Sequence, residues 1–322
     1  MTTRIVSPFG AASTALEVVA GVDLTGRRAI VTGSASGLGV ETARALAAAG
    51  AQVTLAVRNP EAGAATAADI NAAGAGQARV QKLDLSDQGS VAAFVDAWGG
   101  QPLHILIGNA AVMACPLTYT ADGLEMQIGT NHFGHFRLGV GLADALRRGA
   151  QEQGRPARLV SLSSIAHRRG GVDFDDPHYR HRPYDKWEAY GAAKTANALY
   201  AVGFNARMKD SGVTANAVHP GGIMTPLQRH LPREEMIAFG WMDETGKVSD
   251  RFKSTAQGAA TSVWAAVGPE LEGVGGLYLE DCGQAAPWTA EAPFAGVMPH
   301  ALDGVAADRL WALSIETTGA DL

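Results

Sequence analysis

The chain has 322 residues, of which 47% are hydrophobic, and its net charge of −6 comes with no block of lysine or arginine. This charge pattern argues against a nucleic acid or an acidic membrane as the main partner, and no stretch reaches the ~18 uninterrupted apolar residues of a membrane span. The two cysteines lie far apart without ligand spacing and the first residues lack a signal-peptide pattern, so neither a disulfide framework nor a zinc site is expected, and the predicted location is the cytoplasm.

Short runs rich in β-branched residues alternate with alanine-rich helical runs along most of the chain. Strands are expected at 28–32, 52–58, 79–85, 103–110, 158–164, 213–219 and 276–280. Helices are expected at 37–49, 60–73, 90–98, 122–148, 187–209 and 255–267. Such alternation predicts an α/β fold with a doubly wound parallel sheet of about seven strands and helices on both faces. Ligands of such sheets bind at the carboxyl ends of the strands.

The other segments are interpreted from what flanks them. Residues 1–25 are expected to form an N-terminal arm that packs on a single domain spanning 26–322. Two stretches, 166–183 and 224–253, break the strand and helix pattern. We expect loops or short helices there that border a substrate site, with a lid near 223–254.

A glycine-rich turn joins the first expected strand to the first expected helix. Its glycines permit a tight turn and a close approach of the backbone to a pyrophosphate, whose charge the helix N-terminus favours. The position between a strand and a helix makes this a strong signal for dinucleotide binding. The expected contacts are Gly33, Ser34, Ser36, Gly37, Leu38 and Gly39.

The end of the second expected strand bears on the choice of cofactor. An NAD site usually has an acidic residue there that binds the ribose 2′-hydroxyl. Here Val57 occupies that place, and Arg58 and Asn59 follow it. Because a guanidinium matches a phosphate well, Arg58 predicts NADP(H), with NAD(H) as the alternative.

Tyr190 and Lys194 lie four residues apart in the helix expected at 187–209, so they share a helix face. A tyrosine with its ordinary pKa of about 10 is a poor base at neutral pH. A close ammonium favours the phenolate, so we expect Lys194 to lower the pKa of Tyr190 and make it a proton shuttle.

Together, the glycine turn and the Tyr190/Lys194 pair resemble the short-chain dehydrogenase/reductase family, over roughly Leu24 to Glu280. The Asn-His-Phe-Gly-His-Phe and Ser-Ser-Ile-Ala-His runs are similar to its retinol dehydrogenase-like branch, which includes bacterial oxidoreductases. The resemblance implies a Rossmann domain over 26–322 and a catalytic set of Asn131, Ser164, Tyr190 and Lys194. It also implies cofactor contacts from Arg58, Asn59, Asp84, Leu85, Asn109, Ala110, Tyr190, Lys194, Pro220, Gly221, Ile223 and Thr225.

The family's chemistry implies a function for these residues. Hydride would pass between NADP(H) and a carbonyl or alcohol, as in a carbonyl reductase, while Tyr190 exchanges the proton and Ser164 holds the oxygen. Lys194 would also bind the nicotinamide ribose, Asn131 would hold a water beside it, and no metal is required. One alternative is an NAD-dependent alcohol dehydrogenase of the same fold. Another is a non-catalytic nucleotide-sensing protein, against which the complete catalytic set argues.

Three features bear on substrate and assembly. Apolar residues of the lid, Phe239 and Trp241 among them, suggest a pocket for a hydrophobic substrate. The arginines at 168, 169, 180 and 182 could recognise an acidic substrate, although a solvated loop face is the favoured interpretation. The helices expected at 122–148 and 187–209 carry small residues that could pair in a homodimer or homotetramer.

Overall fold

The computed structural model describes residues 4–74 and 76–322, which contain one eight-stranded sheet in the order β3-β2-β1-β4-β5-β6-β7-β8. The first seven strands are parallel, and β8 pairs antiparallel with β7. The strands are β1 (Arg28–Thr32), β2 (Gln52–Val57), β3 (Gln77–Lys82), β4 (Ile105–Gly108), β5 (Ala157–Leu162), β6 (Val213–His219), β7 (Tyr278–Glu280) and β8 (Gly283–Gln284). The predicted doubly wound α/β fold is confirmed, with one short strand more than expected.

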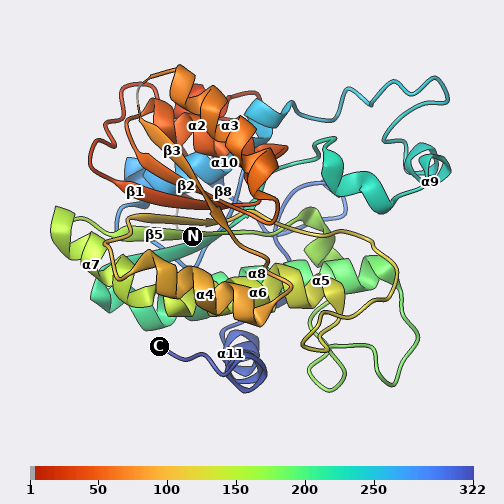
Figure 1. Cartoon of the computed structure of the whole chain (residues 1–322). Coiled ribbons are helices and arrows are strands. Elements are labelled where there is room, and N and C mark those ends of the chain that lie inside the picture. Colours follow the sequence, from red (N-terminus) through yellow and green to blue (C-terminus); the bar gives the residue numbers. More distant parts are fainter. Residues whose placement is uncertain (1–3, 75) are drawn as a thin grey trace.

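Helices cover both faces of the sheet (Figure 1). The α-helices are α1 (Ala15–Val18), α2 (Leu38–Ala48), α3 (Pro60–Ala72), α4 (Gln88–Trp98), α5 (Met126–Ile128), α6 (Gly134–Gly141), α7 (Ala143–Gln153), α8 (Lys186–Met208), α9 (Arg233–Ala238), α10 (Thr255–Val267) and α11 (Gly304–Thr318). One face carries α2, α3 and α10, and the other carries α4, α6, α7 and α8. Two apolar cores fill the spaces between these layers and the sheet. None of the helices in the described residues is long and apolar enough to cross a membrane.

The single helix expected at 122–148 is wrong, because this segment is divided into several pieces. Glu125 caps α5 by accepting a hydrogen bond from the Ile128 amide at 2.9 Å. A π-helical turn then spans Gly129–Phe133, and α6 is separated from α7 at Leu142. Such turns are frequent at functional sites, and this one contains Asn131.

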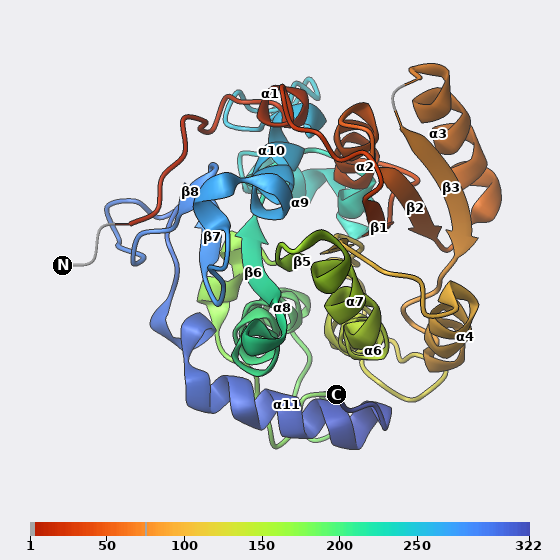
Figure 2. The ribbon, with the colours of Figure 1, turned by 90° about the vertical axis from the view of Figure 1, so that its left-hand side faces the viewer.

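The helix α11 lies across α8 and was missed in the sequence (Figure 2). Its Trp311 packs against Phe136 and Phe204, with ring centroids 4.8 and 6.2 Å apart. A Cβ added at Gly203 of α8 would lie 3.2 Å from the Trp311 ring, so the small residue allows the close approach. This face of α8 is therefore covered by the same chain and is not free to pair with a second copy.

Both edges of the sheet have features that limit further pairing. At one edge β8 has two residues, and the N-terminal arm lies beside it: the Gln284 amide donates to Ile5 O at 2.8 Å, and Val6 forms a bridge with Gly283. Ser7 Oγ also donates to Cys282 O at 2.6 Å. At the other edge β3 carries polar and charged side chains at Gln77, Arg79, Gln81 and Lys82.

Candidate active site

A cleft of about 900 Å³ opens where the strands of the parallel sheet end. Residues that directly follow β1, β2, β4, β5 and β6 all line it, as the strand-end rule predicts. Every site residue predicted from the sequence lines this cleft except three, which are Ser34, Gly39 and Asn131.

The glycines of the turn after β1 are needed for close backbone contacts. Gly33 has a φ of 66°, and a Cβ there would lie 2.8 Å from Ala110 Cα. Gly37 has a φ of 61° and caps α2 without any side-chain hydrogen bond, so the first amides of this helix are open to an anion. A side chain at either position would disturb the turn.

Ser34 and Gly39, which we expected to contact a cofactor, do not line the cleft and pack within the turn. The Ser34 side chain is fully buried, and its hydroxyl donates to Val31 O at 2.9 Å. A Cβ at Gly39 would lie 2.5 Å from Gly33 O, so the first turn of α2 packs directly on the loop. The spacing of the motif could not separate such supporting positions from contact positions.

A chain of buried hydrogen bonds connects the turn to the π-helical segment. The amides of Asn109 and Ala110 both donate to Thr32 Oγ1 at 2.9 Å. Thr32 Oγ1 is also 2.9 Å from His135 Nε2, and His135 Nδ1 is 2.9 Å from Asn131 O. Because a carbonyl can only accept, Nδ1 carries the proton, and the Thr32 hydroxyl donates to Nε2 of a neutral imidazole.

The neutral state of His135 agrees with its surroundings. Burial lowers the pKa of His135 to about 4, with the Asn131 carbonyl opposing the shift and the Lys194 charge adding to it. The ring thus keeps one hydrogen-bond direction throughout the ordinary pH range. The pair His132 and His135, one turn apart, serves packing and hydrogen bonding, since His132 Nε2 lies 2.7 Å from Ser314 Oγ.

Where the cleft passes the ends of β2 and β3, it is lined by the polar side chains of Arg58, Asn59 and Asp84. Arg58 is exposed and has no carboxylate partner among the described residues, whereas Asn59 Oδ1 accepts from the amides of Glu61 and Ala62 and so caps α3. The Asp84 carboxylate accepts from Ser86 Oγ at 2.6 Å, and Leu85 lines the cleft beside it. Arg58 is therefore a cation in this part of the cleft whose charge is not neutralised.

Tyr190, Lys194 and Ser164 lie together in the cleft. Lys194 Nζ is 5.7 Å from the centroid of the Tyr190 ring and donates to Leu162 O at 2.9 Å. Ser163 directly follows β5, and its hydroxyl donates to Lys194 O at 2.7 Å. Ser164 comes next and caps the 3₁₀ helix Ile165–Arg169. Ser164 lines the cleft, and its hydroxyl accepts a hydrogen bond from the Ala166 amide at 3.2 Å.

Burial dominates the ionisation of both helix residues. It raises the pKa of Tyr190 above its ordinary value, and the hydrogen bond with the Ser164 side chain only partly opposes this. Burial also lowers the pKa of Lys194 to about 7. The expected lowering of the Tyr190 pKa is thus wrong for this structure, because the loss of hydration on burial outweighs the one opposing contact, the Ser164 hydrogen bond.

Asn131 is fully buried beside the cleft and binds the backbone. Its Nδ2 donates to Val112 O and its Oδ1 accepts from Val112 N, both at 2.9 Å. The side-chain amide is therefore committed to holding the segment that follows β4, and Val112 itself lines the cleft.

The loop after β6 borders the cleft with Pro220, Gly221, Ile223 and Thr225. Thr225 lies against the glycine turn, since a Cβ at Gly37 would be 3.4 Å from its side chain. Thr225 also begins a short 3₁₀ helix, Pro226–His230, through a reciprocal capping pair with Gln228. The segment that follows, which we expected to form a lid, contains α9 and is joined to α8 by a hydrogen bond that Trp187 Nε1 donates to Glu235 Oε1 at 2.7 Å.

Aromatic side chains form one wall of the cleft, which we call the aromatic wall: Trp187, Phe239, Trp241 and Phe252. Neighbouring rings in this set lie with centroids 5.4 to 5.9 Å apart. Phe239 and Trp241 were expected there from the sequence, whereas Trp187 and Phe252 were missed. Trp187 also meets the catalytic candidate Tyr190, with ring centroids 6.4 Å apart.

The cleft is also lined by four arginines, Arg168, Arg169, Arg229 and Arg251, and by Phe294. The sequence pointed to the first two only as part of a basic loop, and it gave no signal for Phe294, which lies outside every expected element. Their presence in the cleft depends on how the loops fold over the sheet.

The chain is similar to known proteins both in sequence and in structure. The family model for short chain dehydrogenases matches residues 27–236. A Streptomyces lividans protein named "Probable oxidoreductase" is 50% identical over 303 residues, covering 93% of this chain and 100% of that protein. Retinol dehydrogenase 12 of Mus musculus is 39% identical over 301 residues, covering 92% of this chain and 88% of that one.

Two solved structures are similar as well. An uncharacterised protein from Mycobacterium paratuberculosis has a TM-score of 0.72 and 31% identity, covering 98% of this chain and 99% of that one. The NADP complex of RhlG from Pseudomonas aeruginosa has a TM-score of 0.59 and 25% identity, covering 76% and 91% of the respective chains.

Proposed function

The chain belongs to the short-chain dehydrogenase/reductase family, and we propose that it transfers a hydride between NADP(H) and a largely apolar carbonyl or alcohol substrate. Family membership makes the protein an oxidoreductase that uses a nicotinamide cofactor, and its relatives include a retinol dehydrogenase, as the sequence resemblance implied. The observation that carries the finer proposal is the cleft, which contains Tyr190, Lys194 and Ser164 together with the free guanidinium of Arg58.

The residues of the cleft fit a dinucleotide with a 2′-phosphate. The uncapped N-terminus of α2 suits a pyrophosphate. Lys194 uses one of its three N–H donors on Leu162 O, which leaves two for ribose hydroxyls. Arg58 suits the 2′-phosphate, and the RhlG neighbour, which is a complex with NADP, supports this choice.

The catalytic residues have distinct tasks in this proposal. A bound nicotinamide would supply the hydride or accept it. In reduction Tyr190 donates its phenolic proton to the carbonyl oxygen, and Ser164 donates a hydrogen bond that stabilises the developing charge. In oxidation Tyr190 takes the proton back. Lys194 favours the phenolate as it forms, and Asn131 holds the Val112 segment in place rather than offering its side chain to a water.

The proposal is tested by mixing the protein with NADPH and a panel of ketones and aldehydes and following the loss of NADPH absorbance. Consumption of NADPH with formation of the alcohol supports the proposal. Tight NADPH binding with no turnover of any carbonyl or alcohol would favour the nucleotide-sensing alternative.

The cytoplasm remains the proposed location, since both cysteines are buried and free, which suits a reducing compartment.

Arg58→Gln is expected to weaken NADPH binding by about 10- to 100-fold, because one charge-assisted phosphate contact is lost, and to leave NADH binding nearly unchanged. The measurement is a titration of each variant with NADPH and, separately, NADH, followed by nicotinamide fluorescence. Lys82→Gln is the matched control, because Lys82 is an exposed cation at the end of the neighbouring strand that does not line the cleft. Equal affinities of the wild type for the two cofactors would refute the role of Arg58 and favour the NAD alternative.

The pH dependence of alcohol oxidation is expected to reflect the buried phenol. Oxidation needs Tyr190 to accept a proton, and burial raises its pKa, so kcat/KM is expected to rise about tenfold per pH unit without a plateau near pH 7. Carbonyl reduction needs the protonated phenol and should show no such rise. A plateau of the oxidation rate from about pH 7 upward would show that, with cofactor and substrate bound, the Lys194 charge lowers the pKa of Tyr190 by more than burial raises it.

A further inference from the structure

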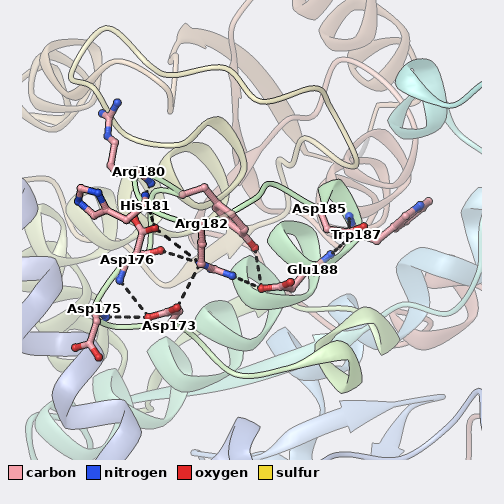
Figure 3. A network of polar contacts seen from close by, with 10 residues as sticks. Asp173, Asp175, Asp176, Arg180, His181, Arg182, Asp185, Trp187 and Glu188 are labelled. Atoms are coloured by element: carbon pink, nitrogen blue, oxygen red, sulfur yellow. Dashed lines mark hydrogen bonds and ion pairs between the residues drawn. The ribbon is translucent and has the colours of Figure 1, made fainter.

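The arginines of the segment after β5 fall into two groups. Arg182 pairs with Asp173 at 3.3 Å and with Glu188, and Arg180 donates to Gly123 O. Figure 3 shows Arg182 among these carboxylates, and neither Arg180 nor Arg182 lines the cleft. Arg168 and Arg169 do line it, so the two ends of one basic segment have different surroundings.

Arg168 and Arg169 combine with Arg251 of the lid into a group that we call the arginine rim. Arg168 and Arg251 approach the same ring, with Cζ atoms 5.7 and 5.3 Å from the centroid of Phe294. Arg169 lies over Trp187, with its Cζ 5.4 Å from the ring centroid. Phe294 is 62% exposed, so the two guanidinium groups flank an aromatic ring at the surface of the cleft.

The positive charge of the arginine rim is not neutralised. None of its three members forms an ion pair with a carboxylate in the described part of the chain, and their protein acceptors are the Pro293 and Gly240 carbonyls and the Ser249 hydroxyl. Burial and the neighbouring Arg169 charge lower the pKa of Arg168. The one carboxylate among the described residues that line the cleft is Asp84, which follows β3 and is bound by Ser86.

The arginine rim lies one aromatic side chain away from the reacting groups. The Trp187 ring has Tyr190 on one side, with centroids 6.4 Å apart, and Arg169 at 5.4 Å. Trp187 is fixed by its hydrogen bond to Glu235 and is part of the aromatic wall. A flat molecule lying along this wall would place one end at Tyr190 and the other near the guanidinium groups.

We propose that the substrate has an anionic group, in the simplest case a carboxylate, separated from its carbonyl by a flat apolar body. The carbonyl lies at Tyr190 and Ser164, the body lies on the aromatic wall, and the anion binds to the arginine rim. Arginine suits this task because its planar fork binds a carboxylate in two places and also stacks on aromatic rings. The inference rests on the proposed function and specifies its substrate class.

The test compares 6-acetyl-2-naphthoate with its methyl ester, which has the same ketone and ring system without the charge. With NADPH saturating, we expect kcat/KM for the acid to exceed that for the ester by about 10- to 100-fold, as for loss of a charge-assisted contact. The preference should shrink as the salt concentration rises, because exposed charges are screened. Equal rates, or a preference for the ester, would overturn the inference and leave the proposed function intact.

The variant Arg168→Gln/Arg251→Gln is expected to bring the acid-to-ester ratio close to one, with the loss appearing mainly in KM for the acid. Arg233→Gln is the matched control: Arg233 is an exposed lid arginine that donates to a loop carbonyl, Glu244 O, at 2.7 Å, as Arg251 donates to Gly240 O, but it does not line the cleft. An unchanged ratio in the double variant would contradict the assignment. NADPH affinity is measured in parallel, so that a cofactor role of these arginines would be detected.

A binding measurement separates this inference from the proposed function. Calorimetry measures the affinity of the NADP-bound protein for 2-naphthoate and for 2-naphthamide. Neither ligand has a ketone, so the comparison does not depend on turnover. Tighter binding of naphthoate that the double variant removes supports the arginine rim even if neither ketone is reduced. Equal binding of the two naphthalenes in the wild type would refute it.

Discussion

Tyr190→Phe is expected to lower kcat for carbonyl reduction by about 10²- to 10⁴-fold, the usual size of a general acid's contribution. The substitution removes only the phenolic oxygen, while the ring keeps its place in an apolar cluster with Met113 and Leu231. Cofactor affinity should therefore change little. Single-turnover kinetics with NADPH and a reactive ketone measure the chemical step, and fluorescence titration measures cofactor binding in the same variant.

Tyr200→Phe provides the control from the same helix. Its hydroxyl is buried and has no hydrogen-bond partner among residues 4–74 and 76–322, so its removal should leave the rate unchanged and cost no stability. Two results would contradict the assignment of Tyr190 as the proton donor. One is turnover of Tyr190→Phe close to that of the wild type, and the other is an equal loss of activity in Tyr200→Phe.

Gly33→Ala is expected to weaken NADPH binding by about 100-fold or more. The φ of 66° disfavours an alanine, which costs about 1–2 kcal/mol in the left-handed region, and the new Cβ would lie 2.8 Å from Ala110 Cα. The turn must then move away from the end of β4. That movement would also disturb the amide hydrogen bonds that Asn109 and Ala110 donate to Thr32.

Gly26→Ala is the control that separates the effect of backbone strain at a positive φ from the effect of moving the glycine turn. Gly26 has a φ of 80°, but a Cβ there would meet no atom of the residues that the structure describes within 4 Å. This control should lose stability of the same order from the backbone strain and keep its NADPH affinity. NADPH titration and thermal unfolding of both variants make the comparison, and the close-approach argument fails if Gly33→Ala binds NADPH as tightly as the control.

The fold was largely predictable, because the β-branched runs and the alanine-rich runs of the sequence alternate in the same order as the strands and helices of the structure. The helix α10 has its expected bounds, since Ser254 and Gln257 form a reciprocal cap at its start. The segment 122–148 has a helical pattern, but it contains the π-helical turn Gly129–Phe133 and a break at Leu142. It also packs closely on the segment that follows β3, since a Cβ at Gly134 would lie 2.2 Å from Leu85 O, a contact that only the folded chain reveals. The helix α11 was not predicted, because its place on α8 depends on the packing of Trp311 against Phe136, which is distant in sequence.

The candidate site was predictable where its residues directly follow strands. It was less predictable where burial sets the pKa of a side chain or where the folding of loops brings residues into the cleft. Tyr190 and Lys194 line the cleft as their spacing indicated, yet the spacing could not show that burial would raise the pKa of Tyr190. Phe294 lies beside Arg168 and Arg251 although it is more than 40 residues from either in sequence. No periodic pattern links such distant positions, so the arginine rim required the structure.

The edges of the sheet restrict how copies of this chain can associate. An exposed strand edge offers a row of free amides and carbonyls to any passing strand, and proteins limit this hazard with charges or with very short edge strands. Here one edge strand, β3, carries charged and polar side chains. The other edge consists of the two-residue strand β8 and the N-terminal segment that pairs with it at Val6. Growth of the sheet from one molecule into the next is thereby disfavoured, and we expect any homodimer or homotetramer to form through helices and loops.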